Sequence, residues 1–487
     1  MNQETKQKTL SFLRDTIALS SDVVNDHITD YESKKPHPKR DMFDCLRQHA
    51  RNFLGGNIRD RLIILSGLRG SGKTTLFAQI FFDLSDIPPN RKIFMSLDKV
   101  RALGLSLIDV LDVYEKEILN SPFEKLDDPV FLFLDEVQYD SNWALTLKTI
   151  YDRTGNGKVC VFATGSAALI LQGGRVGTDI ARRAQYERLF PMSFPEYMKV
   201  KRGGSFGKEG LADDIRKAFV RSANAEELFA EMKSLTPRIK DYLSDVSSAE
   251  TSHYLKYGGL PFVVFRGSRL QQIYNRIYQV IEKVVGSDIM TFSDLEKGTV
   301  ARIPEILYTV AHSDTVPVST LSKNMGLSRS VITDVLKSME RSEMLLKIPP
   351  RSSVSGRLGK SSKYTFLAPP VRATLFHVFG TPLREEQIES RLLEDVVALY
   401  LHRAFVHENA WSLAYDPVES AADFVITKNE KAIVFEVGLG CKNAGQVYKT
   451  MNRINKESFG IVISSRPLAI DEERKVVYVP IETFLLM

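Results

Sequence analysis

The chain has 487 residues, of which 43% are hydrophobic and 26% charged, and it carries a net charge of +5. A chain of this length is too long for one hydrophobic core, so we expect a globular protein of two to four domains. Its three scattered cysteines predict neither a disulfide framework nor a zinc site, and its eight histidines show no ligand spacing. No apolar run is long enough to cross a membrane and the polar start lacks a secretion signal, so we expect a cytoplasmic protein without a membrane partner.

Residues 1–40 are expected to form a helical extension that ends in a linker, because Tyr31–Arg40 contains two prolines among charged residues. From residue 41 to 202, apolar runs alternate with helical stretches, the pattern of a parallel sheet covered by helices. The predicted strands are nearly continuous apolar runs, as strands buried on both faces should be: Leu62–Ser66, Lys92–Leu97, Val130–Leu134 and Lys158–Thr164.

A glycine-rich loop follows the first of these strands and opens a helix. Its sequence, GLRGSGKTT, matches the phosphate-binding pattern GxxxxGK[ST]. Glycines let backbone N–H groups curl around phosphate oxygens, and the helix directs its positive end at the same anion. The spacing predicts that Lys73 reaches the outer phosphates of ATP and that the Thr74 hydroxyl holds Mg²⁺. The residues expected to line this nucleotide site are Gly67, Leu68, Arg69, Gly70, Ser71, Gly72, Lys73, Thr74 and Thr75.

Two acidic residues follow the apolar strand Val130–Leu134. We expect Asp135 to hold Mg²⁺ through water, and Glu136 to act as the general base or to orient the attacking water. The next strand ends in Thr164, which either senses the γ-phosphate or, with Ser166, caps the following helix.

Two arginines farther along the chain, Arg182 and Arg183, offer guanidinium groups that could stabilise transition-state charge. They could act within the same chain or from a neighbouring subunit of a homo-oligomer.

In this order the motifs resemble those of archaeal and bacterial AAA-type ATPases of the DExQ kind, over about residues 50–487. The resemblance rests on Gly67–Thr75, Met95–Asp98, Leu134–Gln138, Trp143, Thr164–Ser166, Pro191–Tyr197 and Tyr257–Pro261. It implies an α/β P-loop NTPase core at 41–202 that hydrolyses ATP with Mg²⁺. It further implies a helical lid at 203–295, a winged-helix domain at 296–375 and an α/β restriction-nuclease-like domain at 380–487.

The positive charge of the chain gathers between Ser319 and Thr365, where nine basic and three acidic residues give +6 and leave the rest at −1. A short helix Ser319–Asn324, a turn at Gly326 and a second helix capped by Ser328 fit a helix-turn-helix. The inward side of the second helix is expected to carry Val331, Val335 and Met339.

Two strands, Leu345–Ile348 and Lys363–Leu367, are expected to follow, joined by a basic, serine-rich wing. Such a domain binds either DNA or a protein, and the concentrated charge favours mainly non-specific duplex DNA. The residues expected to contact DNA are Arg329, Ser330, Thr333, Lys337, Arg351, Arg357 and Lys360.

The resemblance to restriction-type nucleases also implies a possible second metal site, formed by Glu394, Asp423 and Glu436. Gly438 stands where that family has its lysine, although Lys442 could reach back from the loop. The domain is therefore either an active nuclease or, as the missing lysine favours, a degenerate domain that is structural or holds DNA.

Three functions follow from these patterns. The first is an ATPase whose nucleotide state changes its grip on DNA. The others are an ATP-gated, metal-dependent nuclease and an ATP-dependent switch that binds a protein partner rather than DNA.

Overall fold

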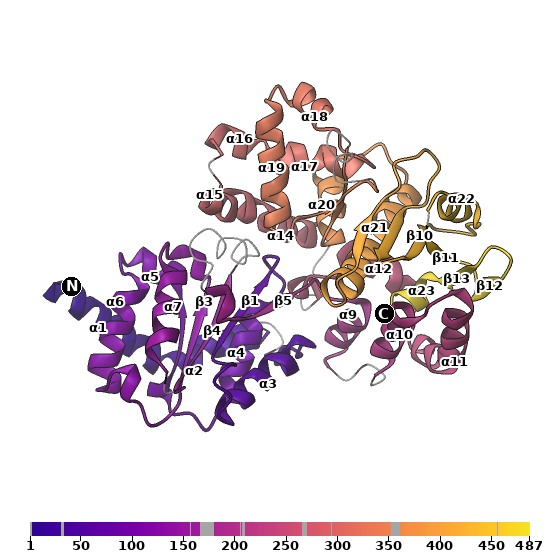
Figure 1. The fold of residues 1–487 in the computed structure, drawn as a ribbon. Helices are drawn as coiled ribbons and strands as arrows, with labels where there is room; N and C mark the ends of the chain where they lie inside the picture. Colours follow the sequence, from indigo (N-terminus) through magenta and orange to yellow (C-terminus); the bar gives the residue numbers. More distant parts are fainter. Residues whose placement is uncertain are drawn as a thin grey trace. The chain divides into compact units, whose positions relative to one another are not determined.

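The computed structural model describes the chain apart from residues 1, 31–33, 156, 166–179, 205, 207–209, 265–269, 294, 352–360 and 455, and the side chains of 181, 291 and 292. It divides into two compact units (Figure 1). The first comprises Met1–Phe190 and Thr291–Ser293, and the second Pro191–Met290 and Asp294–Met487. Among the described helices, none combines the length and the apolar character that a membrane span requires.

The first unit is built on a five-stranded sheet whose paired neighbours are all parallel, in the order β2-β3-β4-β1-β5. The strands are β1 (Leu62–Gly67), β2 (Lys92–Ser96), β3 (Val130–Asp135), β4 (Val159–Gly165) and β5 (Gln185–Leu189). The predicted parallel sheet is confirmed, and each of the four expected strands ends within one residue of its predicted limits. The edge strand β5 was not predicted, because its sequence QYERL lacks the apolar run of the others.

Helices cover both faces of this sheet, because successive residues of a strand point to opposite sides. Leu62 and Ile64 of β1 join one buried cluster, and Ile63 and Leu65 join another that is rich in phenylalanine. The helices of this unit are α1 (Gln3–Ala18), α2 (Ser20–Ile28), α3 (Met42–Leu54), α4 (Lys73–Asp83), α5 (Leu97–Ala102), α6 (Leu107–Val113) and α7 (Trp143–Arg153). Short helical turns are η1 (Pro89–Arg91), η2 (Tyr114–Leu119), η3 (Phe123–Lys125), η4 (Val137–Tyr139) and η5 (Ile180–Arg182).

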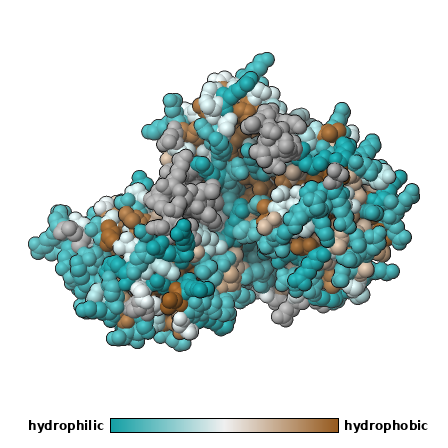
Figure 2. Space-filling view, viewed as in Figure 1, coloured by the Kyte–Doolittle hydropathy of each residue, from teal (hydrophilic) through white to brown (hydrophobic). Residues whose placement is uncertain are grey.

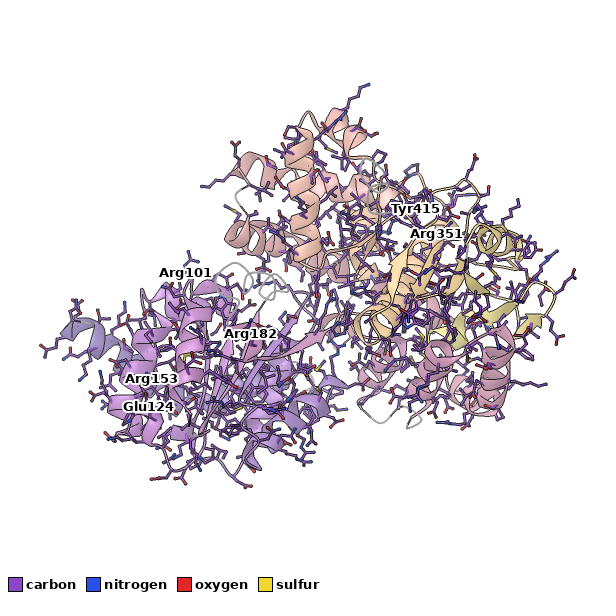
Figure 3. All side chains as sticks on the ribbon, viewed as in Figure 1. Arg101, Glu124, Arg153, Arg182, Arg351 and Tyr415 are labelled. Carbon is purple, nitrogen blue, oxygen red and sulfur yellow. The ribbon has the colours of Figure 1, made fainter. Side chains whose placement is uncertain are left out.

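The end of α7 is tied to the preceding loop by an ion cluster. Arg153 contacts Glu124 at 2.5 Å, a pair that Figure 3 labels, and Glu115 at 2.9 Å.

The second unit contains a six-stranded mixed sheet in the order β12-β13-β11-β10-β9-β8. Its central pairs β10–β11 and β11–β13 are parallel, and the outer pairs are antiparallel. The strands are β8 (Ser412–Ala414), β9 (Phe424–Lys428), β10 (Lys431–Val437), β11 (Glu457–Ser464), β12 (Ala469–Asp471) and β13 (Val476–Pro480). Its own helical segments are α21 (Glu385–Leu401), η8 (His402–His407), α22 (Gly445–Arg453) and α23 (Ile481–Phe484).

The region 203–295, expected to form a lid, continues a helical run that begins at Phe194 and whose first four helices share the core of this second sheet. Residues of α9, α10, α11 and α12 lie in one buried cluster with α21 and with strands β10, β11 and β13. Phe219 of α10 packs edge-on against Phe484 of α23, with ring centroids 5.5 Å apart. The apolar face of α10 needs a partner, and the sheet supplies it. The run comprises α9 (Phe194–Lys201), α10 (Leu211–Arg221), α11 (Ala225–Ser244), α12 (Ala249–Tyr257), α13 (Pro261–Val264), α14 (Leu270–Lys283), η6 (Val284–Asp288) and α15 (Ile289–Phe292).

The basic region forms a compact helical subdomain with a two-stranded antiparallel sheet. Its elements are α16 (Lys297–Ala301), α17 (Ile303–His312), α18 (Val318–Met325), α19 (Arg329–Arg341), β6 (Leu345–Ile348), β7 (Lys363–Phe366) and α20 (Pro369–Phe379). The buried side of α19 carries Ile332, Val335, Leu336 and Met339. Val331 is only half-buried, so its expected inward position was wrong by one residue: the helical repeat runs from Ile332.

Candidate functional site

The phosphate-binding loop is held in shape by its strand, its helix and one buried arginine. At Gly67 a Cβ atom would lie 2.5 Å from the carbonyl oxygen of Leu189, so only glycine lets β1 and β5 run this close. Gly72 adopts φ 99° directly before α4, a conformation that costs glycine little. Arg40 is buried and donates from Nη1 to the Ser71 carbonyl at 2.7 Å.

The same Arg40 donates from Nη2 to the carbonyl of Phe190 at 2.9 Å. Arg40 was expected to lie in a linker, so its contact with the loop was not predicted. Proline and charge predict a loop, but nothing in the local sequence shows that the loop's last arginine returns to a distant backbone.

Lys73 and Thr74 begin α4 with their polar ends at the loop. Lys73 is buried, and its Nζ donates to the carbonyls of Gly67 (2.8 Å) and Leu68 (3.2 Å). Thr74 donates from Oγ1 to Asp135 Oδ2 at 2.7 Å. The loop and the acidic end of β3 therefore meet, as their spacing predicted.

Asp135 is a buried carboxylate with a strongly altered acidity. Burial, and then the neighbouring charge of Glu136, raise the pKa of Asp135 to about 7. An oxygen-rich pair of this kind suits Mg²⁺, which prefers hydroxyl, carboxylate and water oxygens and would favour the ionised carboxylate. Two further buried hydroxyls, Ser71 Oγ and Thr164 Oγ1, have no hydrogen-bond partner among the described residues. The residues present thus fit a phosphate and its cation.

Glu136 follows β3 with φ 53° and is restrained by two polar neighbours. Gln138 donates from Nε2 to Glu136 Oε2, and Arg69 Nη2 of the loop lies 3.9 Å from Glu136 Oε1. This carboxylate is 21% exposed, so it remains accessible to water.

Thr164 is the last residue but one of β4, the strand that lies between β3 and β1. Its partner on β1 is Leu65, and Ala163 pairs with Leu134 of β3. The expected alternative, a helix cap with Ser166, lies outside the described residues.

Arg182 and Arg183 are not brought to the loop of their own chain. They precede β5, which runs parallel to β1, so they lie at the amino edge of the sheet whereas the loop follows its carboxyl edge. Six extended residues at about 3.3 Å each, about 20 Å, lead from Arg183 to Leu189 beside Gly67. Arg183 pairs with Asp152 of α7 at 2.6 Å, and Arg182 is exposed (Figure 3). A role in the same chain is therefore excluded by the direction of β5.

The helix-turn-helix residues form an exposed polar surface. Gly326 makes the turn with φ 58°, and Ser328 Oγ accepts from the Val331 N–H at 3.3 Å. Arg329, Ser330 and Lys337 of α19 are exposed, and Thr333 is half-buried. Lys347 adds an exposed cation on β6.

Arg351, expected in the wing, is engaged elsewhere. Its backbone N–H donates to the Tyr415 carbonyl at 2.7 Å, and its Nη2 donates to the Arg453 carbonyl at 3.2 Å (Figure 3). It therefore links the basic region to the mixed sheet. Arg357 and Lys360 lie outside the described residues.

The three carboxylates of the possible second metal site do gather, with lysines among them. Lys363 of β7 contacts Glu394 of α21 at 2.9 Å and Asp423 at 3.5 Å. Lys442 contacts Glu436 of β10 at 2.9 Å. Lys363 was counted in the basic region, but it is buried and unavailable to DNA.

Burial raises the pKa of Asp423 to about 7, against the opposing charge of Lys363. Burial acts on Glu394 as well, but the charge and hydrogen bond of Lys363 outweigh it and leave that pKa below its ordinary value. Burial also raises the pKa of Glu436, which Lys442 counteracts. The two lysines therefore offset part of the negative charge of the three carboxylates.

Gly438, the position of the missing lysine, is explained by this arrangement. A Cβ atom there would overlap the side chain of Lys442, whose stem passes over the glycine to reach Glu436. The cation is supplied from the loop, and glycine at 438 makes room for it.

Comparison with known proteins identifies the kind of domain that contains the glycine loop. Residues 59–198 match the family model described as "AAA domain". Over 476 residues the chain is 31% identical to the uncharacterized protein MJ1637 of Methanocaldococcus jannaschii, and the alignment covers 95% of this chain and 94% of that one. The chain belongs to the family of this archaeal protein. Residues 59–198 form an AAA-type ATPase domain whose P-loop α/β sheet lies in the first unit.

Two solved structures with similar folds cover much of the chain at low similarity. Aeropyrum pernix Orc1, solved in complex with DNA, is 12% identical with a TM-score of 0.32, over 72% of this chain and 95% of that one. Cdc6p from Pyrobaculum aerophilum is 14% identical with a TM-score of 0.26, over 74% and 99%. TM-scores this low carry no argument about the function of this family member.

Proposed function

We propose that this chain binds and hydrolyses ATP with Mg²⁺ at its P-loop, and that the nucleotide state changes how its second unit binds duplex DNA. The observation that carries the proposal is the hydrogen bond from Thr74 to Asp135, beside Lys73 inside the glycine loop. Loop amides and Lys73 bind the outer phosphates. Thr74 and Asp135 hold Mg²⁺, which neutralises charge on the phosphates.

The residues around Glu136 support its proposed role as general base. Its carboxylate takes a proton from the attacking water, while Gln138 and Arg69 fix its orientation. The buried Thr164 hydroxyl, which lacks a hydrogen-bond partner among the described residues, would contact the γ-phosphate or the attacking water. Arg182 or Arg183 would serve only a neighbouring subunit of a homo-oligomer.

The ATPase proposal is tested by Lys73→Ala and Glu136→Gln, with Glu226→Gln on the exposed side of α11 as the matched control. We expect Lys73→Ala to lose nucleotide binding and turnover. Glu136→Gln should keep ATP binding and lose about 100-fold in turnover, the scale of general-base catalysis. Fluorescent-nucleotide titration and phosphate release measure the two. Turnover at the native rate in both variants would refute the site.

The DNA proposal takes the basic region as a winged helix whose α19 meets the duplex. It is supported by the exposed Arg329, Ser330 and Lys337 and by the cap at Ser328. ATP turnover measured with and without duplex DNA should show stimulation. If the chain binds no DNA at any salt concentration, the subdomain serves a protein partner instead.

A second candidate function is an ATP-gated, metal-dependent nuclease. It is supported by Glu394, Asp423 and Glu436 lying in one cluster, and by Lys442 filling the role that position 438 lacks. Incubation of supercoiled plasmid with Mg²⁺ or Mn²⁺ under each nucleotide condition tests it, with Glu436→Gln as the inactive control. A plasmid left intact throughout eliminates the nuclease.

A further inference from the structure

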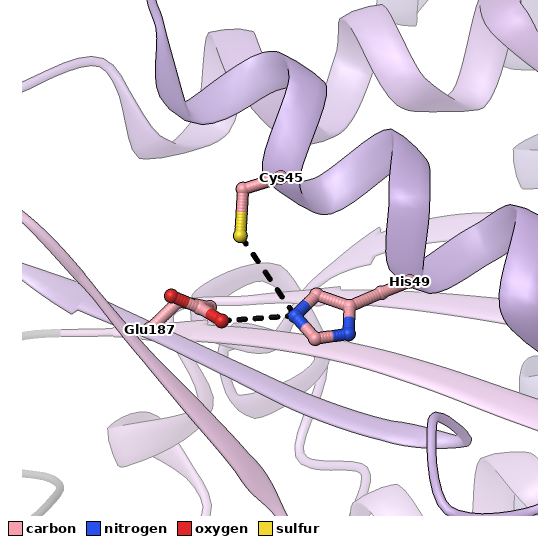
Figure 4. A group of neighbouring side chains, drawn as sticks. All are labelled: Cys45, His49 and Glu187. Atoms are coloured by element: carbon pink, nitrogen blue, oxygen red, sulfur yellow. Dashed lines mark hydrogen bonds and ion pairs between the residues drawn. The ribbon is translucent and has the colours of Figure 1, made fainter. Parts of the chain in front are cut away.

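A cluster in the first unit joins three metal-ligating side chains that the ATP site does not use. Cys45 and His49 lie four residues apart on α3, and Glu187 comes from β5 (Figure 4). Residues four apart share one face of a helix, so both side chains point at the same strand. The sequence analysis did not single out this pair, because the third side chain comes from a distant strand.

The ligand atoms of these residues converge on one point. Cys45 Sγ lies 3.9 Å from His49 Nε2, which lies 2.9 Å from Glu187 Oε1, and all three atoms lie within 4.8 Å of one another. Tetrahedral zinc, with bonds of about 2.0 Å to nitrogen and about 2.3 Å to sulfur, separates its ligand atoms by about 3.3 to 3.8 Å. The observed spacings bracket that range, so side-chain rotation alone could seat the ion. Among the described residues, this is the one group of at least three cysteine, histidine or acidic side chains whose ligand atoms all lie within 4.8 Å of one another.

The opposite nitrogen of His49 faces a supporting carboxylate. His49 Nδ1 lies 3.2 Å from Asp60 Oδ1, and the other Asp60 oxygen accepts from Asn52 at 2.7 Å. A metal-bound histidine usually has a carboxylate on its second nitrogen, which fixes the tautomer and the ring orientation. The His49 and Glu187 side chains are 15% and 25% exposed, so an ion can reach them from solvent.

We propose that Cys45, His49 and Glu187 form a zinc site, with Asp60 as the positioning residue and water in the fourth position. Sulfur, imidazole and carboxylate together suit Zn²⁺ rather than Mg²⁺ or Ca²⁺, which take oxygen ligands. The ion would tie α3 to the edge strand β5. That strand ends at Leu189, whose carbonyl touches the start of the glycine loop at Gly67. Zinc would therefore stabilise the edge of the sheet on which the P-loop rests.

The alternative to a bound zinc ion is a protonated His49 ring. Hydrogen bonds to Cys45 and then Glu187 raise the pKa of His49 to about 10 in the metal-free cluster, so an imidazolium between two carboxylates also satisfies the ring. The two occupants are separated by a measurement of the metal itself.

The test adds Zn²⁺ or Co²⁺ to the whole chain after treatment with a chelator. Excess Mg²⁺ is present, because it competes with the added ion for sites that have only oxygen ligands. We expect one Zn²⁺ per chain by elemental analysis after desalting, and a cobalt–thiolate charge-transfer band with Co²⁺. Cys45→Ser should abolish the band and weaken zinc binding at least tenfold. Cys441→Ser, which removes an exposed cysteine in the second unit, is the matched control and should change neither.

The Asp60→Asn variant tests whether Asp60 orients the His49 ring for zinc or only fills space beside it. This variant should keep the cobalt–thiolate band, because the ligands remain, and lose about 10- to 100-fold in zinc affinity. No cobalt–thiolate band in the native chain, or zinc binding unchanged in Cys45→Ser, would overturn the proposal and leave the imidazolium cluster. ATP binding by the Lys73 site is measured separately, so failure here leaves the ATPase proposal intact.

Discussion

Arg40 is the residue that connects the phosphate-binding loop with the end of the first unit. One nitrogen of its buried guanidinium binds the Ser71 carbonyl in the loop, and another binds the carbonyl of Phe190, the last residue before the second unit begins. Hydrogen bonds from a charged group contribute about 1.5 to 3 kcal/mol each when both partners are buried. Arg40 therefore fixes the loop in the shape that the phosphates require.

Arg40→Ala should weaken ATP binding about tenfold or more, because the Ser71 carbonyl loses its donor and the loop loses a preorganised conformation. Titration with a fluorescent ATP analogue measures this. Arg14→Ala, which removes an exposed arginine from α1, is the control and should leave affinity unchanged. An Arg40→Ala variant that binds ATP like the native chain would show that the loop holds its shape without this brace.

At the level of secondary structure, the features that could be predicted are those that depend on residues close together in the sequence. The apolar runs of β1 to β4 and the glycine loop were found because burial and phosphate binding leave a local signature. The strand β5 lacks that signature, since it is an edge strand with polar residues. Lys363 was read as part of a positive surface, but β7 carries it into a group of carboxylates from α21 and the mixed sheet. Pairings of this kind depend on tertiary structure.

Lys363→Met tests the role of β7 in holding these carboxylates. Without the cation, Glu394 and Asp423 stay buried near each other, so the lowered pKa of Glu394 should rise above its ordinary value and the raised pKa of Asp423 should rise further. The folded state would then bind more protons than the unfolded state above about pH 4, and stability should fall as pH rises. We expect a loss of about 3 kcal/mol at pH 8 and a clearly smaller one at pH 5.

Urea unfolding of the second unit can be followed separately, because the chain has two tryptophans and Trp411 lies in the second unit. In a Trp143→Phe background its fluorescence reports that unit. Lys347→Met on the adjacent strand β6 removes an exposed lysine and should cost little at either pH. An equal loss at pH 5 and pH 8 would mean that the cost comes from packing rather than charge.

For the whole molecule, the division into two units was the least predictable feature. The motif pattern placed a boundary at residue 202 and a lid after it. In the structure the main segment of the first unit runs to Phe190, and the helices α9 to α12 share the core of the mixed sheet. Each helix can be predicted from its apolar face, but the sequence does not indicate which other element that face packs against. Exposed side chains give no further guide, because hydrophobic residues on the face seen in Figure 2 occur in small groups among hydrophilic ones.

DNA binding by α19 should show the salt dependence of phosphate contacts. Each contact contributes about 0.9 to the slope of log K against log salt, so Arg329→Ala with Lys337→Ala should lower the slope by about two. Lys233→Ala with Lys240→Ala on α11 removes the same charge from another exposed face of that unit and should leave the slope unchanged. Fluorescence anisotropy with a labelled duplex at several salt concentrations gives both slopes. Equal slopes in the two double variants would place the DNA elsewhere.

The same assay shows whether the two units communicate. The chain passes from the first unit to the second at Phe190–Pro191, where Arg40 joins the last carbonyl to the P-loop. If nucleotide acts through this link, ATP should shift the DNA affinity of the native chain, and Arg40→Ala at saturating ATP should remove that shift without changing the salt slope. Glu136→Gln holds the ATP state without turnover, so it should show the full shift. A shift that persists in Arg40→Ala would show that the coupling does not depend on the hydrogen bonds from Arg40 to Ser71 and Phe190.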